Sequence, residues 1–245
     1  MVYIDTHCHI ERYGDKIEDI VKRAINAGVK IIVNNGANPE GNRETLELAS
    51  KFKEIRAALG FHPTEVSSSI DDEIKFINKN RSKIVALGEV GMDFSSDATD
   101  EEKQREDFQK IIDLSLKIKI PMMVHSRKAE EAVIKMLEYS KAKKVVMHCF
   151  SGNMKLVKKI IENKWMLSIP ASVKYNAHFQ KVVEITPITQ LLCETDSPYL
   201  HPDRKENNEP AFVVEAYKKI AEIKKLKIEE VEKIIEGNYN KMFLD

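Results

Sequence analysis

Short runs of apolar residues recur along the whole chain and predict eight β-strands. Several of these runs are nearly continuous in Val, Ile, Leu and Met, which is typical of strands buried on both faces of a parallel sheet. The predicted strands are Val2–Ile10, Val29–Asn34, Ile55–Leu59, Ile84–Glu89, Ile120–His125, Lys144–Cys149, Trp165–Ile169 and Gln190–Asp196.

The segments between these strands carry apolar residues at helical spacing. Ile20, Val21 and Ala24, for example, fall on one face of a helix. Two closing helices are predicted after the eighth strand, at Phe212–Lys225 and Ile228–Phe243. Strands that alternate with helices in this way predict an α/β fold, a (β/α)8 TIM barrel, with an open doubly wound sheet as the alternative.

The composition is that of an ordinary globular protein, with 42% hydrophobic and 32% charged residues and a net charge of zero. No shift in composition and no Gly/Ser-rich linker divides the chain, so residues 1–245 are expected to form one barrel domain. Zero net charge argues against a broad electrostatic footprint on nucleic acid, but it allows binding at one local pocket.

The sequence has no apolar run approaching about 20 residues. Its N-terminus also lacks a basic segment followed by an apolar one. Neither a membrane span nor a secretion signal is therefore expected. Three widely spaced cysteines do not suggest a disulfide framework, and the expected location is cytoplasmic.

The first predicted strand ends in two histidines, His7 and His9. Successive side chains of a strand point to opposite faces, so these two imidazoles share one face. They could bind one metal ion together, or they could be ordinary polar residues where a strand reaches the surface. The pair alone does not decide between the two interpretations.

Other residues with reactive or metal-binding side chains also follow predicted strand ends, which form the active-site face of such barrels. Imidazole and carboxylate together suit zinc, manganese or iron rather than calcium. Four histidines and two carboxylates exceed what one tetrahedral ion needs, and they suit two bridged ions. The strand-end residues are His7, His9, His62, Glu89, Asp93, His125, Arg127, His148, Glu194 and Asp196.

Single residues of this set also have structural interpretations. Glu89 could pair with a lysine, and Asp196 could cap the following helix. His62 could contact substrate or merely order the turn before Pro63. Arg127 suits a phosphate group, with a structural ion pair as the alternative.

Cys8 and Cys149 stand next to candidate ligands in the sequence. By strand alternation both are expected to point away from the pocket, into the layer between strands and helices. They are interpreted as small buried residues rather than nucleophiles. A Cys–His hydrolase is therefore disfavoured.

Taken together, these motifs resemble those of the TatD family of metal-dependent hydrolases over nearly the whole chain. The shared segments are DTHCHI, GFHP, GEVGMD, HSR, HCFSG and ETDSPYL. The resemblance implies two divalent ions per chain, zinc, magnesium or manganese, bridged by Glu89. It also implies catalytic roles for Glu89 and for Asp196, the general base that takes a proton from the attacking water. The implied ligands are His7, His9, Glu89 and Asp196 for one ion, and Glu89, His125 and His148 for the other.

The resemblance further implies exonuclease-like hydrolysis of DNA phosphodiester bonds by a metal-activated water, at single-stranded ends. His62 and Arg127 are expected to bind the substrate. The alternative is hydrolysis of a carboxylic ester, amide or lactone, such as an aminoacyl-RNA ester, because substrate does not follow from fold. A metal-stabilised scaffold without activity is disfavoured, since every expected ligand is present. Neither a membrane nor an obligate protein partner is implied.

Overall fold

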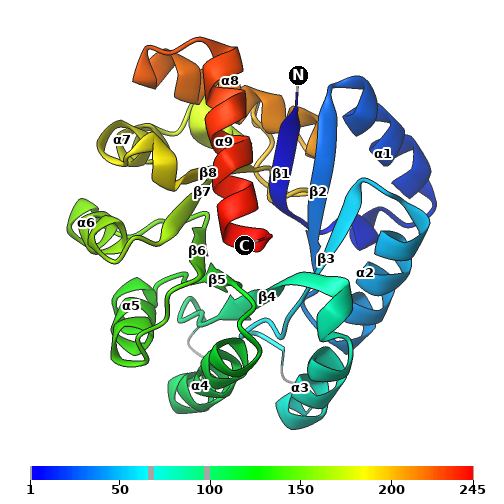
Figure 1. Ribbon diagram of the computed structural model, residues 1–245, viewed down its shortest axis with the longest axis vertical. Helices are drawn as coiled ribbons and strands as arrows, with labels where there is room; N and C mark the ends of the chain where they lie inside the picture. The colour runs from blue at the N-terminus through cyan, green and yellow to red at the C-terminus, as the bar shows by residue number, and fades with distance from the viewer. Residues whose placement is uncertain (1, 66–68, 97–99, 245) are drawn as a thin grey trace.

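The structure is a computed structural model that describes residues 2–65, 69–96 and 100–244. Its centre is a parallel eight-stranded sheet whose strands follow one another in chain order (Figure 1). All eight predicted strands are confirmed, with ends that differ from prediction by no more than two residues. They are β1 Tyr3–Cys8, β2 Val29–Asn35, β3 Ile55–Leu59, β4 Ile84–Gly91, β5 Met122–His125, β6 Val145–His148, β7 Met166–Pro170 and β8 Leu191–Glu194.

The sheet closes into a barrel between β1 and the segment that follows β8. The amide of Asp196 donates to the carbonyl of His7 at 2.9 Å, and the amide of His9 donates to the carbonyl of Ser197 at 2.8 Å. Cys8 and Ser197 also form a parallel bridge. This closure rules out the open doubly wound sheet, and it brings the two ends of the sheet together at the strands' carboxyl ends.

Helices α1 to α8 surround the barrel, and α9 lies across one of its ends (Figure 1). Asn38, Asp100, Asn153 and Asn176 cap the starts of α2, α4, α6 and α7 through side-chain oxygens, as short polar side chains commonly do. In the described part of the chain, no helix is long and apolar enough to cross a membrane. The helices are α1 Ile17–Asn26, α2 Pro39–Lys51, α3 Ile70–Lys79, α4 Glu101–Ile118, α5 Glu130–Tyr139, α6 Met154–Glu162, α7 Ala177–Ile185, α8 Val213–Lys224 and α9 Ile228–Phe243.

The two predicted closing helices are confirmed. Helix α9 has the predicted bounds, and α8 begins at Val213 because Pro210–Phe212 forms a short 3-10 turn before it. Asn238 of α9 donates to the carbonyls of Ile188 and Leu191, at the start of β8. The last helix is therefore fixed to the end of the barrel at which the strands begin.

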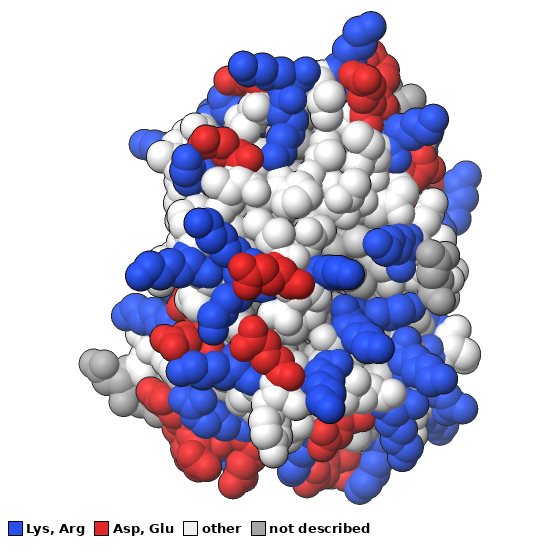
Figure 2. Space-filling model, turned by 60° about the vertical axis from the view of Figure 1, so that its left-hand side comes forward, with Lys and Arg blue, Asp and Glu red and all other residues white. Residues whose placement is uncertain are grey.

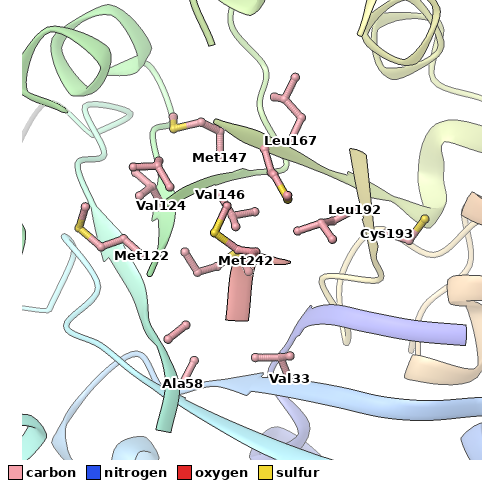
Figure 3. Close-up of a cluster of buried hydrophobic side chains, with 14 of the residues drawn as sticks. Val33, Ala58, Met122, Val124, Val146, Met147, Leu167, Leu192, Cys193 and Met242 are labelled. Atoms are coloured by element: carbon pink, nitrogen blue, oxygen red, sulfur yellow. The ribbon is translucent and has the colours of Figure 1, made fainter. Parts of the chain in front are cut away.

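The barrel interior is apolar directly below the layer of polar strand-end residues. Residues two apart in a strand share a face, so Val146 lies one layer below His148, and Leu192 lies one layer below Glu194. Figure 3 shows Met242, from the end of α9, among the side chains of this apolar layer. Met242 is only 5% exposed. The C-terminal helix thus contributes a side chain to the core that supports the polar layer.

Replacing Met242 with alanine is expected to lower the free energy of unfolding by about 2–5 kcal/mol, because it leaves a cavity in the barrel core. Urea unfolding followed by circular dichroism measures this change. The matched control is Tyr139→Ala on α5, where the residue is 89% exposed and a change within about 0.5 kcal/mol is expected. Equal stability of the two variants would contradict the assigned packing of α9.

Charged side chains of both signs are spread over the protein surface. Figure 2 shows the face over α5 to α7, where basic side chains cover the larger share and acidic ones lie among them. Helix α6 contributes Lys155, Lys158, Lys159 and Glu162. The mixture of both signs fits the zero net charge of the chain. The face shown in Figure 2 is not covered by one sign of charge alone.

Candidate metal centre

All six side chains predicted as metal ligands meet at one end of the barrel. They belong to β1, β4, β5 and β6 or follow β1 and β8 within two residues, at the strands' carboxyl ends. Five of them line a cavity of about 810 Å³, and His7 is completely buried beside them. The five that line the cavity are His9, Glu89, His125, His148 and Asp196.

Glu89 stands at the centre of this cluster, and its two carboxylate oxygens face different pairs of histidines. Its Oε2 lies 3.5 Å from His7 Nε2 and 3.2 Å from His9 Nε2. Its Oε1 lies 2.9 Å from His125 Nδ1 and 3.0 Å from His148 Nε2. The alternative lysine partner is not found among the described residues. A carboxylate divided in this way between two donor pairs is suited to bridge two cations.

Burial and the surrounding imidazoles act on Glu89 in opposite directions. Burial disfavours its ionised form, but the electrostatic interactions with His62, His148 and His7 and the hydrogen bond from His125 outweigh burial, so the pKa of Glu89 lies well below its usual range. The carboxylate is therefore negative at neutral pH. A negatively charged carboxylate in this position attracts cations.

Two glycines give the backbone around Glu89 the room it needs. A Cβ atom on Gly60 would lie 2.3 Å from the backbone oxygen of Glu89, closer than real Cβ contacts. A Cβ atom on Gly88 would lie 2.6 Å from Asn35 Oδ1. The backbone that carries Glu89 can therefore pack closely against the segment that follows β3 and against Asn35 of β2.

Asp196 faces the Oε2 side of Glu89. Its Oδ1 lies 3.6 Å from His7 Nε2 and 3.9 Å from His9 Nε2. Its backbone φ of 54° lies in the left-handed region and turns the chain sharply after β8. The carboxylate therefore points at the histidines and does not cap a helix. Burial raises the pKa of Asp196 to about 6, so this group can exchange a proton near neutral pH.

The donor atoms of the cluster fit divalent cations. His7, His9 and Glu89 each offer one ligand atom within 4.8 Å of the others, and so do His62, Glu89 and His125. Imidazole nitrogens and carboxylate oxygens together form a donor set for zinc or manganese. The two sets share the carboxylate of Glu89, through Oε2 in the first set and Oε1 in the second.

His125 and His9 are oriented by hydrogen bonds on the ring nitrogen that faces away from the cluster, and His148 has a charged neighbour there. His125 Nε2 lies 2.9 Å from Asp93 Oδ2, and His9 Nδ1 lies 2.8 Å from the carbonyl oxygen of Asn35. His148 Nδ1 lies 3.4 Å from Glu194 Oε1, a looser contact. Partners of this kind fix the ring tautomer and leave the opposite nitrogen free for a metal ion.

The sequence pattern placed Asp93 and Glu194 at strand ends but assigned neither a role. The available signal was their position in GMD and ETD, each next to a strand that carries a candidate ligand. Asp93 also accepts a hydrogen bond from the Ser95 amide at 2.8 Å. Burial acts against ionisation of Asp93, but the hydrogen bonds from His125 and Ser95 outweigh it and lower the pKa.

Asp93→Asn is expected to weaken metal binding about 10- to 100-fold, because His125 loses the carboxylate that orients its ring. Competition with a fluorescent chelator measures the affinity. The control variant is Asp72→Asn on α3, whose side chain is 76% exposed and pairs with Lys75. Equal affinities of the two variants for metal would contradict the orienting role of Asp93.

His62 and Arg127, the predicted substrate-binding residues, both line the cavity. His62 Nε2 lies 3.6 Å from Glu89 Oε1, and its Nδ1 lies 2.7 Å from Thr64 Oγ1. His62 therefore contacts the cluster and orders the following turn at once, and burial lowers its pKa to about 4. Arg127 is exposed, and the alternative ion pair is not found among the described residues.

The prediction that Cys149 points away from the pocket is wrong. Cys149 is only partly buried and lines the cavity. Its backbone φ is 42°, so strand alternation no longer applies one residue after β6. Cys8 is fully buried, with its Sγ 3.6 Å from the carbonyl oxygen of Val33. Burial and then the charge of Asp196 raise the pKa of the Cys149 thiol, which keeps it from acting as a thiolate nucleophile.

Comparisons with known proteins identify the family of this chain. A family model described as TatD related DNase matches residues 4–244. An uncharacterized metal-dependent hydrolase of Methanocaldococcus jannaschii is 36% identical over 247 residues, which cover 98% of this chain and 96% of that protein. Human deoxyribonuclease TATDN3 is 28% identical over 98% of this chain and 94% of that protein. The crystal structure of YJJV, a TatD homolog from Escherichia coli K12, matches with a TM-score of 0.93 at 24% identity over 99% of this chain and 98% of that chain. This chain therefore belongs to the TatD family of metal-dependent hydrolases.

Proposed function

We propose that the protein is a deoxyribonuclease that hydrolyses phosphodiester bonds at single-stranded DNA ends with two divalent metal ions. The division of Glu89 between two histidine pairs is the observation that carries this proposal. Many enzymes that cleave phosphate esters bind two cations close together in this way. The deoxyribonuclease name of the human relative supports DNA as the substrate.

The proposed ligand assignment follows the two oxygens of Glu89. The ions are zinc, magnesium or manganese, since the donors are imidazoles and carboxylates. Glu89 serves both ions. The proposed ligands are His7, His9, Glu89 and Asp196 for one ion, and Glu89, His125 and His148 for the other.

When bound, such ions lower the pKa of water and stabilise the negative charge that develops on a phosphate. Asp196 accepts the proton of the attacking water through its carboxylate. A P–O bond to that water forms, and the P–O bond to one sugar oxygen breaks, with the leaving oxygen taking up a proton from solvent. Arg127 holds a phosphate oxygen through its guanidinium, and His62 donates to another from the cavity wall.

The size of the cavity and the zero net charge of the chain favour a strand end over a long duplex as the substrate. A volume of about 810 Å³ lies within the range of pockets that enclose one small ligand. The chain has no net charge, so binding along the backbone of a duplex would gain little electrostatic energy. The cluster also lies inside the mouth of the barrel, where an unpaired nucleotide can enter.

The test is a matrix of metals and substrates. Metal-free protein is reconstituted with zinc, manganese or magnesium and incubated with single-stranded and blunt duplex DNA labelled at either end. An aminoacyl ester and a set of lactones test the alternative carbonyl chemistry. Metal-dependent shortening of single strands is expected. Turnover of a carbonyl substrate without DNA cleavage would contradict the proposal and favour the ester, amide or lactone hydrolase.

A further inference from the structure

Arg12 and Tyr199 form a pair on the rim of the cavity that the proposed chemistry leaves without a role. Arg12 lies in the 3-10 segment Ile10–Lys16 that follows β1, and Tyr199 follows Asp196 by three residues. The Nη1 of Arg12 donates a hydrogen bond to the hydroxyl of Tyr199 at 2.7 Å. Both residues line the cavity. The two sides of the barrel closure are therefore linked directly at the mouth.

The backbone of Tyr199 is fixed as firmly as its hydroxyl. Its amide donates to the carbonyl of Asp196 at 2.9 Å. Its carbonyl accepts a hydrogen bond from Asn208 Nδ2 at 2.6 Å, and the same nitrogen donates to the carbonyl of Thr195 at 2.8 Å. The ring is thus held in place at both ends before any ligand arrives, so little conformational entropy would be lost on binding.

The ring itself remains open to solvent. Tyr199 is 48% exposed, and few large apolar side chains in the described residues are as exposed. Its centroid lies 6.5 Å from that of His9, at an interplanar angle of 68°. Arg12 contacts the hydroxyl, with its guanidinium carbon 5.7 Å from the ring centroid. An ordered and exposed aromatic surface therefore lies beside the candidate ligand His9, on the rim of the cavity.

We propose that Tyr199 stacks against an unpaired base next to the cleaved phosphodiester, while Arg12 contacts the neighbouring phosphate. This rests on the proposed nuclease function and specifies how the substrate is recognised. Aromatic stacking accepts every base, because each has a π face. A base inside a duplex is covered by its neighbours on both faces, so this contact selects an unpaired end without reading its sequence.

The test compares DNA strands that differ by a single abasic nucleotide, placed at the first or second position from the cleaved end. For wild-type holoenzyme, loss of the stacked base is expected to lower kcat/KM about 5- to 150-fold. On the intact strand, Tyr199→Ala is expected to lower kcat/KM by the same factor. On the abasic strand, the variant is expected to have the same kcat/KM as the wild-type protein. Tyr199→Phe keeps the ring and is expected to stay within about threefold of wild type.

Tyr199→Leu serves as a second variant if the alanine variant unfolds, because it retains apolar bulk without an aromatic face. Equal losses on intact and abasic strands, for either variant, would overturn the stacking role. Cleavage of no DNA by wild-type protein would instead overturn the proposed function itself, so the two failures are distinguishable.

The role of Arg12 is tested through the salt dependence of KM on the intact strand. Arg12→Gln is expected to raise KM and to reduce the slope of log affinity against log salt by about 0.7, as for the loss of one phosphate contact on a single strand. An unchanged slope would overturn the phosphate contact.

Discussion

Glu89→Gln is expected to lower hydrolysis about 10³-fold or more, because it removes the negative charge shared by both cation positions. Glutamine preserves the size of the side chain, but its amide NH2 group donates hydrogen bonds. It cannot bind the cation that the histidine pair on its side would hold. The oxygens of Glu89 lie 2.9–3.5 Å from the ring nitrogens of those pairs. Metal content should fall together with activity, as measured by plasma mass spectrometry after dialysis.

The matched control for Glu89 is Glu73→Gln. Glu73 is also a buried glutamate, only 2% exposed, but it lies on α3 and pairs with Arg43. Loss of this pair is expected to affect stability and leave metal content unchanged. Full metal content in Glu89→Gln protein, or equal metal loss in both variants, would contradict the bridging role of Glu89.

Asp196→Asn is expected to lower kcat about 10²- to 10⁴-fold, the usual range for loss of a general base. The asparagine side chain can still offer its carbonyl oxygen to a cation, but it cannot take a proton. The control is Asp203→Asn, in the loop that follows Tyr199, where the carboxylate is 46% exposed and pairs with Lys174. Undiminished DNA cleavage by Asp196→Asn protein with metal still bound would contradict the assignment of Asp196 as the general base.

The pH dependence of wild-type activity follows from the same residue. A protonated Asp196 cannot accept a proton, so kcat/KM should rise with pH as this group ionises and then level off. Burial raises the pKa of Asp196 to about 6, and a neighbouring cation shifts ionisation to lower pH. The acidic limb is therefore expected at or below about pH 6, and it should be absent in Asp196→Asn protein.

The strands could be predicted from the sequence because parallel strands buried on both faces are apolar over most of their length, whereas closure of the sheet was established only by the structure. Runs such as Ile84–Leu87 are apolar throughout, and the number of such runs and their alternation with helices favour a barrel. The convergence of the six candidate ligands could also be predicted, since all carboxyl ends of parallel barrel strands lie on one face. His7 lies on the first strand and Asp196 follows the last strand, and they are neighbours for that reason.

Features that depend on local backbone conformation or on exact distance could not be predicted. Cys149 enters the cavity because its backbone leaves the strand conformation, which alternation cannot foresee. The carbonyl of Asn35 that orients His9 has no signal in residue type. The contact of Arg12 with Tyr199 joins residues 187 positions apart, and it arises only when the barrel closes. Sequence pattern thus identified the face of the site, and the structure identified its supporting contacts.

The most direct test of the two-cation site is anomalous diffraction from crystals of the protein reconstituted with manganese or zinc. Two anomalous peaks are expected, one beside each carboxylate oxygen of Glu89, with His7 and His9 at one peak and His125 and His148 at the other. A single peak, or peaks that leave Glu89 uncoordinated, would contradict the account.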